Sequence, residues 1–269
     1  MFLSFIFARY LGEVSILSNI SVELNFGCQV RETGLFRTQN VDGIMGMSAS
    51  RDTLPYELFA SGRTVTKAFA MCFKHNGGVL SLGGVDTRLH KTKMEFVRAH
   101  ILSSGWYQVK LLDILLISEE EVESVHEAGN GDVQGRAVSL GEEDVKRLNV
   151  GKGVIVDSGT TDTYLPRYLK TRFESIFQTI STAAYSTTRM NLTPTQRKRL
   201  PAILLKLQGQ DGDTVTIHVP SSAYIESLGK SIYIGRLFLT EGSGAVLGAN
   251  VMSDHDVVFD PENKRVSDV

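Results

Sequence analysis

One short apolar run that ends in an aspartate constrains this chain more than any other stretch. Residues 153–161 read Gly-Val-Ile-Val-Asp-Ser-Gly-Thr-Thr. The β-branched residues predict a buried strand, and the small and hydroxyl residues after them predict a tight turn. We expect the backbone and hydroxyl groups of this turn to hold the carboxylate of Asp157. Asp157 is the only aspartate in the sequence that is followed by Ser or Thr and then by Gly.

Short strands separated by glycine dominate the rest of the sequence and predict a mostly-β chain. The 269 residues include 25 glycines and few long stretches with helical periodicity. Alternation of apolar and polar residues predicts strands at 21–26 and 214–219. Further strands are expected at 79–84, within the apolar segment 106–116, and in a hairpin formed by 257–260 and 264–266.

Two segments have the periodicity of amphipathic helices. Residues 166–184 place five apolar side chains on one face, and Pro166 suits the first turn of a helix. Those side chains are Leu169, Phe173, Ile176, Phe177 and Ile180. A shorter helix is expected at 52–60, where Leu54, Leu58 and Phe59 form the apolar side.

The composition argues against several classes of function. A net charge of −2 gives no reason to expect binding to nucleic acid or to an anionic membrane surface. No apolar run reaches the roughly 18–20 residues of a membrane span. The acidic run at 119–123 and the polar residues up to 135 are interpreted as a solvated loop. The six histidines show no ligand spacing, so we expect neither a metal nor another cofactor.

Three features bear on the compartment of the protein. Cys28 and Cys72 form either one disulfide or two buried free thiols. Residues 19–21 and 191–193 are N-glycosylation sequons, which are typical of a secretory route. The first eight residues resemble the apolar core of a signal peptide without its basic start, and they fit a β-strand equally well.

Five segments between about Asn25 and Val266 match one known family in the same order. They are 42–47 (Asp-Gly-Ile-Met-Gly-Met), 78–84, 106–109, the Asp157 turn, and 244–248 taken together with 256–260. In this order they resemble the pepsin-like aspartic proteases, in which each lobe carries one such aspartate turn. Residues 26–29, 32–36, 69–72 and 255–260 resemble the nepenthesin and plasmepsin V branch more than pepsin itself.

The resemblance implies a mostly-β, bilobal pepsin-like fold. Residues 1–98 would be an incomplete N-terminal lobe, and residues 99–269 would be the C-terminal lobe that carries Asp157. An apolar-apolar-Gly element braces the aspartate turn of each lobe in this family. Two such elements occur here, at 44–46 (Ile-Met-Gly, the front brace) and at 246–248 (Val-Leu-Gly, the rear brace).

The resemblance also implies roles for the turn residues. Asp157 would be a catalytic carboxylate, and Thr160 would hydrogen-bond its outer oxygen. Ser158 would bond across the lobe interface, and Gly159 would let the backbone approach the substrate. Thr161 either lines the cleft or packs below it. Asp162 is expected to be a solvated turn residue.

The front brace has no aspartate turn of its own in this sequence. By resemblance, that aspartate strand and the substrate-covering hairpin would lie before Met1. Tyr10 is a poor candidate for the hairpin tyrosine, because residues 11–13 do not suggest a hairpin. A lobe without its central strand leaves edges unpaired, so the front of the chain is expected to fold poorly.

The chemistry of the family requires two carboxylates. They share one proton, so the charged member activates a water and the protonated member polarises the peptide carbonyl. The resemblance therefore implies an aspartic endopeptidase that acts on peptides or proteins, as a monomer, in a secreted or endomembrane location. Two alternatives are a catalytically inactive, pepsin-like peptide-binding module and a homodimer in which two Asp157 turns meet.

Overall fold

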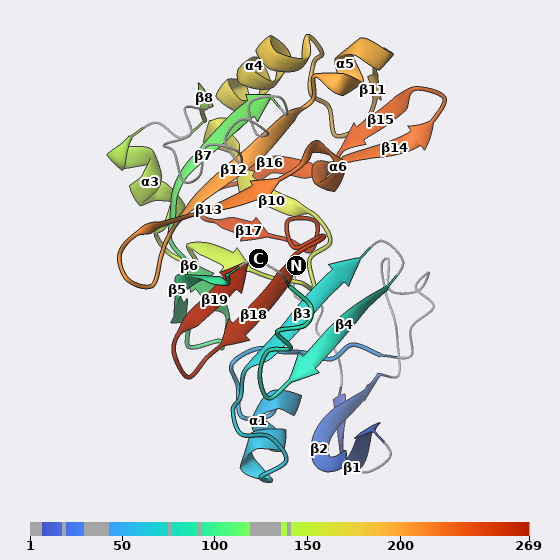
Figure 1. Cartoon of the computed structure of the whole chain (residues 1–269), viewed down its shortest axis with the longest axis vertical. Helices are drawn as coiled ribbons and strands as arrows, with labels where there is room; N and C mark the ends of the chain where they lie inside the picture. Colours follow the sequence, from blue (N-terminus) through green and yellow to red (C-terminus); the bar gives the residue numbers. More distant parts are fainter. Residues whose placement is uncertain are drawn as a thin grey trace.

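A ten-stranded sheet runs through the middle of the molecule (Figure 1). The computed structural model describes residues 7–17, 20–29, 43–74, 77–90, 93–118, 136–138 and 141–268. In sheet order the ten strands are β16 (Leu237–Glu241), β10 (Thr163–Pro166), β17 (Ala245–Leu247), β9 (Val154–Val156), β6 (Tyr107–Val109), β5 (Glu95–Ile101), β19 (Arg265–Asp268), β18 (Asp256–Asp260), β3 (Phe69–Lys74) and β4 (Gly77–Leu82). The mostly-β class predicted from the sequence is confirmed.

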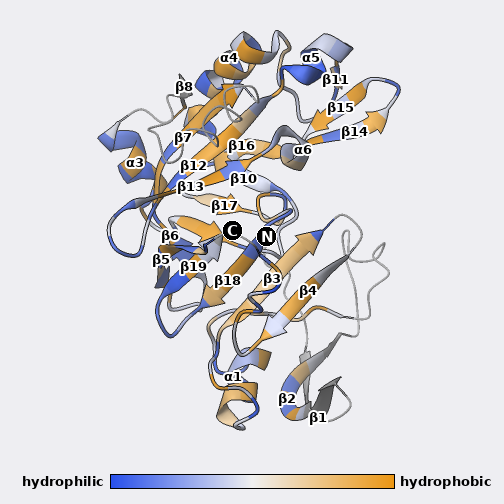
Figure 2. Ribbon diagram, in the orientation of Figure 1, coloured by the Kyte–Doolittle hydropathy of each residue, from blue (hydrophilic) through white to orange (hydrophobic). Residues whose placement is uncertain are grey.

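A second, antiparallel sheet lies in the upper part of Figure 1. Its order is β13 (Thr214–Val219), β12 (Pro201–Gln208), β7 (Leu111–Ser118) and β8 (Arg136–Ala137). Helix α4 (Lys170–Ser181) packs on β7 and β12. Figure 2 shows β7 and β12 as largely hydrophobic, because alternate residues of both strands are buried on opposite faces.

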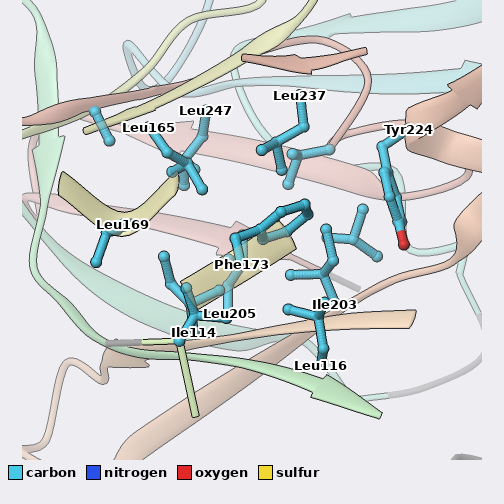
Figure 3. Packing of buried hydrophobic residues seen from close by; sticks show 14 of the residues in the cluster. Ile114, Leu116, Leu165, Leu169, Phe173, Ile203, Leu205, Tyr224, Leu237 and Leu247 are labelled. Atoms are coloured by element: carbon cyan, nitrogen blue, oxygen red, sulfur yellow. The ribbon is translucent and has the colours of Figure 1, made fainter. Parts of the chain in front are cut away.

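The largest hydrophobic core lies between this sheet, α4 and the strands around β10. Phe173 is completely buried and lies in the middle of the cluster (Figure 3). Its ring meets Tyr185 edge-on, with the ring centroids 5.1 Å apart. The alternate residues of β7 and β12 form a smaller cluster of Leu115, Ile117, Ala202 and Leu204. Residues around Asp157 are therefore supported by a well-filled interior.

Smaller elements complete the fold. A three-stranded sheet contains β11 (Met190–Asn191), β15 (Ile232–Gly235) and β14 (Ile225–Gly229). The remaining elements are β1 (Phe7–Leu17), β2 (Ile20–Gln29), α1 (Leu54–Ala60), α3 (Glu142–Leu148), the 3-10 helix η2 (Arg167–Leu169), α5 (Pro194–Lys198) and α6 (Ser221–Tyr224). Thr193 caps α5 in a reciprocal hydrogen-bonded box with Gln196.

The hairpin of β18 and β19 is inserted into the part of the sheet formed by the first hundred residues. β18 pairs with β3, and β19 pairs with β5, so the two strands lie between segments that are far away in sequence. Phe69 and Phe259 stack in this region with their ring centroids 4.9 Å apart. Strand β5 spans the predicted boundary at residue 98, and the division into 1–98 and 99–269 stays a prediction.

Most strands predicted from the sequence are confirmed. The segment 214–219 is β13, the segment 106–116 contains β6 and most of β7, and the C-terminal hairpin is present. The long helix differs from its prediction at both ends. Pro166 ends β10 rather than starting a helix, and α4 ends at Ser181 because Thr182 adopts a left-handed conformation (φ 59°).

The first part of the chain has a small core of its own. Val22 of β2 packs with Leu54 and Leu58 of α1, as the apolar side predicted for that helix requires. Tyr10 of β1 pairs with Phe26 of β2 in an antiparallel hairpin, so the expectation that no hairpin surrounds it is wrong.

Large apolar side chains are exposed in this first part. Ile44 is 67% exposed and Met45 is 48% exposed. Phe26, Val79 and Leu80 are also exposed. β4 forms an edge of the ten-stranded sheet. This region therefore buries less apolar surface than the part built around α4.

Cys72 is a buried free thiol on β3. For this residue the free thiol, rather than the disulfide, is therefore the prediction that is confirmed. Asn191 of the second sequon is exposed on β11.

Several predictions concern residues outside the described ranges: the signal-like start up to Ile6, the sequon residue Asn19, residues 32–36, Asp42 and the loop 119–135. No helix in the described parts of the chain is both long and apolar enough to cross a membrane.

We predict that Phe173→Ala lowers the free energy of unfolding by about 3–5 kcal/mol, because it leaves a cavity in the largest core. Gln178→Ala, at an exposed position of the same helix, should change it by less than about 0.5 kcal/mol. Urea denaturation followed by circular dichroism measures both. A loss below about 1 kcal/mol for Phe173→Ala would contradict the assignment of this residue to the core.

We also predict an acid-sensitive contribution from Asp260, the last residue of β18. Burial raises the pKa of its carboxyl group, but hydrogen bonds from Asn263 and Arg265 outweigh burial and lower the pKa. A folded-state pKa below the unfolded value of about 4 means that ionised Asp260 stabilises the fold above that pH. This contribution is lost as the pH falls through the folded-state pKa.

Asp260→Asn should therefore be less stable than the unmodified chain at neutral pH, and the difference should shrink as the pH falls below about 4. Denaturation series at several pH values measure this difference. Asp211→Asn, at an exposed turn, is the matched control and should show no such trend. A difference that stays constant with pH would contradict the prediction.

Candidate functional site

Asp157 follows β9 near the centre of the ten-stranded sheet. β9 pairs in parallel with β17 and antiparallel with β6, and Val154 and Ile155 are buried. The backbone N–H of Asp157 donates to the carbonyl of Leu247 over 3.0 Å, which extends the parallel pairing by one residue. The predicted buried strand thus delivers the carboxylate to a fixed place at its end.

The turn after Asp157 holds both carboxylate oxygens. The backbone N–H of Gly159 donates to Oδ1 over 2.9 Å, and the hydroxyl of Thr160 donates to Oδ2 over 2.6 Å. The backbone N–H of Thr160 also donates to the carbonyl of Asp157 over 3.2 Å. The hydrogen bond predicted from Thr160 is present, and the two donors together fix the plane of the carboxylate.

The rear brace packs directly against this turn. The backbone N–H of Ala249 donates to the carbonyl of Thr160 over 2.7 Å, and that of Asn250 donates to the carbonyl of Thr161 over 3.1 Å. A Cβ atom on Gly248 would lie only 2.2 Å from the carbonyl oxygen of Asp162. Only glycine permits this approach, which explains the residue at the end of the rear brace.

The front brace has a different environment. A Cβ atom on Gly46 would meet no heavy atom within 4 Å among the described residues, and Ile44 and Met45 are exposed. The two braces resemble each other in sequence, but only the rear brace contacts an aspartate turn in the described part of the chain. This difference agrees with the single aspartate motif of the sequence.

A cavity of about 970 Å³ brings the aspartate turn and the residues of the front brace together. Asp157, Ser158 and Thr160 of the turn line it, and so do Gly46 of the front brace and the adjacent Met47. Its remaining lining residues are Ser48, Phe69, Met71, Trp106, Tyr107, Lys152, Ile155, Val156, Tyr164, Glu241, Val246 and Phe259. The lining is mainly apolar and aromatic with a few polar groups, as is usual for a ligand site.

The other predicted turn residues differ in their positions. Ser158 is half-buried and lines the cavity, and its bond across the lobes stays a prediction. Thr161 is exposed and does not line the cavity. Gly159 is exposed, and its backbone N–H donates to Oδ1 of Asp157.

Asp162 is not the solvated residue that we expected. Its side chain is only 13% exposed and lies 3.6 Å from the guanidinium of Arg236. Burial raises the pKa of its carboxyl group, and Arg236 offsets part of this effect. Sequence alone missed this ion pair because Arg236 comes from a loop 74 residues further along the chain (236 − 162).

Three features of the cavity were not anticipated from the sequence. Lys152 and Glu241 form an ion pair on its wall. Tyr164 also lines it and stacks on Phe238, with the ring centroids 5.2 Å apart. The hydroxyl of Tyr107 is buried with no hydrogen-bond partner among the described residues, and burial raises its pKa. Among those residues no group of three or more His, Cys, Asp and Glu side chains is placed to hold a metal ion.

Sequence comparisons identify relatives of this chain. Residues 10–268 match the family described as eukaryotic aspartyl protease. The chain is 26% identical to aspartic proteinase 36 of Arabidopsis thaliana over 265 residues, which cover 92% of this chain and 48% of that protein. It is 24% identical to pregnancy-associated glycoprotein 2 of Bos taurus over 271 residues, which cover 96% of this chain and 62% of the relative.

A further match is β-secretase of Strongylocentrotus purpuratus, which is 30% identical over 215 residues. These residues cover 70% of this chain and 35% of the relative. The chain spans about half the length of the Arabidopsis proteinases that it matches. The narrower resemblance to the nepenthesin and plasmepsin V branch stays a prediction.

We predict that a glycine-to-alanine substitution destabilises the protein in the rear brace but has little effect in the front brace. Gly248→Ala should lower the free energy of unfolding by about 1–3 kcal/mol, because the new Cβ would clash with the carbonyl oxygens of Asp162 and Thr160. Gly46→Ala should change it by less than about 0.5 kcal/mol, because the space there is open. Urea denaturation measures both, and equal losses in the two variants would refute the difference between the braces.

Proposed function

This chain belongs to the eukaryotic aspartyl protease family, and we propose that it supplies one half of an aspartic endopeptidase site, with Asp157 as its catalytic carboxylate. One observation carries the proposal: the carboxylate lies on a cavity wall with both oxygens held by the turn. A fixed carboxylate facing an apolar cavity is the arrangement that acid–base catalysis on a bound peptide requires.

The turn residues support distinct steps in this proposal. Gly159 and Thr160 orient the carboxylate of Asp157, so that its remaining lone pairs accept a hydrogen bond from a water in the cavity. Asp157 takes a proton from that water as the oxygen attacks the peptide carbonyl. Ser158, which also lines the cavity, would contact the facing lobe.

The reaction needs a second carboxylate, which holds a proton and polarises the carbonyl. Asp157 and Glu241 are the acidic residues that line the cavity in the described part of the chain, and Glu241 is paired with Lys152. We therefore place the second aspartate on a strand that packs against the front brace in the whole protein. The exposed side chains of Ile44 and Met45 and the open space at Gly46 support this position.

A second candidate function is a peptide-binding module without catalytic activity. The observation that favours it is the single Asp-Ser/Thr-Gly motif in 269 residues. Such a module would use the same cavity and would bind extended peptides without cleaving them. The two functions differ in whether a second aspartate is present, whereas a monomeric state is expected for both.

The test begins with the reading frame upstream of Met1 in the transcript, followed by expression of the whole protein. If an in-frame Asp-Thr/Ser-Gly is present, the protein should cleave peptides, and Asp157→Asn should lower kcat/KM by about 10²–10⁴-fold. Peptide cleavage over a pH series measures this effect. Asp211→Asn, at an exposed turn away from the cavity, is the control and should leave kcat/KM unchanged.

Cleavage that persists in the Asp157→Asn variant would refute the catalytic role. If no second motif exists, the peptide-binding function predicts that Asp157→Ala leaves peptide affinity largely unchanged. Cleavage by the wild-type chain that Asp157→Ala abolishes would then rule out the inactive module.

A further inference from the structure

The side chains of Lys152 and Glu241 form an ion pair in the wall of the cavity. The ammonium of Lys152 contacts Oε2 of Glu241, although 89 residues separate them in sequence. The two side chains are 36% and 27% exposed, so both remain accessible from the cavity that they line. A charged pair in a mainly apolar and aromatic lining gives that part of the cavity a specific chemistry.

Two glycines hold the pair in place. Lys152 precedes β9, and Glu241 ends β16, where it lies opposite Pro166 of β10. The backbone N–H of Ala245 donates to the carbonyl of Gly153 over 2.9 Å, and a Cβ atom on Gly244 would lie 2.3 Å from that carbonyl oxygen. Gly153 and Gly244 both have positive φ, at 57° and 67°. The loops that carry the two charges are thus locked together by the backbone.

The pair lies within reach of a peptide bound at Asp157. Lys152 precedes Asp157 by five residues, so the two positions are at most about 18 Å apart. An extended peptide advances about 3.3 Å per residue, so roughly five of its residues span that distance. Ile155, Val246 and Tyr164 line the same cavity as the pair and Asp157.

The chemistry of the pair favours a neutral side chain that both donates and accepts. The ammonium has three N–H groups and the carboxylate has two oxygens, so donors and acceptors remain after the two groups pair. The two charges cancel, so neither an acidic nor a basic side chain gains a net attraction. A carboxamide presents one carbonyl oxygen and one NH₂ group side by side, which matches the ammonium and the carboxylate.

We propose that Lys152 and Glu241 form a specificity subsite that selects an Asn or Gln side chain of the bound peptide. The proposal rests on the proposed function of the cavity as a peptide site. Tyr164 and Val246 line the same cavity and would contact the apolar stem of that side chain. Removing one charge leaves the other unpaired, which converts the subsite into one that attracts the opposite charge.

The test measures peptide binding by fluorescence anisotropy, so it does not depend on cleavage. Fluorescent peptides selected from a random library are varied at each position in turn to Gln, Glu, Lys or Leu. For the unmodified chain, one position should prefer Gln over the other three residues by about tenfold, which corresponds to about 1.4 kcal/mol. At that position Lys152→Met should change the preference to Lys, and Glu241→Gln should change it to Glu.

The matched controls remove an ion pair elsewhere. Lys170 and Glu174 form an exposed pair on α4 and do not line the cavity. Lys170→Met and Glu174→Gln should leave every preference unchanged. Thermal denaturation of all four variants checks folding, and half-exposed pairs of this kind contribute little to stability.

Peptide binding without a reciprocal change of preference in the Lys152 and Glu241 variants would overturn the subsite and leave the proposed function intact. A preference that changes equally in the α4 controls would also overturn it. Failure of the unmodified chain to bind any peptide, together with failure of the whole protein to cleave any, would overturn both the subsite and the proposed function.

Discussion

A backbone contact between the rear brace and the aspartate turn organises the centre of this molecule. Gly248 lies so close to the carbonyl oxygens of Asp162 and Thr160 that no side chain fits between them. The contact joins the ends of β9 and β17 to the start of β10, and β16 pairs onto β10. The position of the carboxylate, the shape of the cavity and the packing of these strands therefore depend on one another.

The two braces have similar sequences but differ in burial and in the contacts that they make. The rear brace is buried against a turn, and its hydrogen bonds are directed at that turn. The front brace lines the same cavity with Gly46, but its apolar side chains are exposed. Exposed apolar side chains contribute little to stability, so within the described residues the front brace is less well packed than the rear brace. This difference in packing is consistent with the sequence, which contains an aspartate turn for the rear brace but none for the front brace.

Local sequence predicted those features that depend on neighbouring residues. The strand before Asp157, the hydrogen bond from Thr160 and the alternating strand β13 all follow from patterns a few residues long. Features that depend on distant residues were missed. Arg236 pairs with Asp162, and Glu241 pairs with Lys152, although no local pattern links either pair. Pro166 was assigned to a helix because its pairing with β16 is equally invisible in the sequence.

The insertion of β18 and β19 has a consequence for synthesis on the ribosome. β3 and β5 lie side by side with the terminal hairpin only after residues 256–268 have left the exit tunnel. Until then the nascent chain displays open strand edges on both segments, for as long as more than 150 further residues take to be translated (256 − 101 = 155). Such edges pair readily with other chains. The exposed edges of β3 and β5 are therefore open to wrong pairing until residues 256–268 are available.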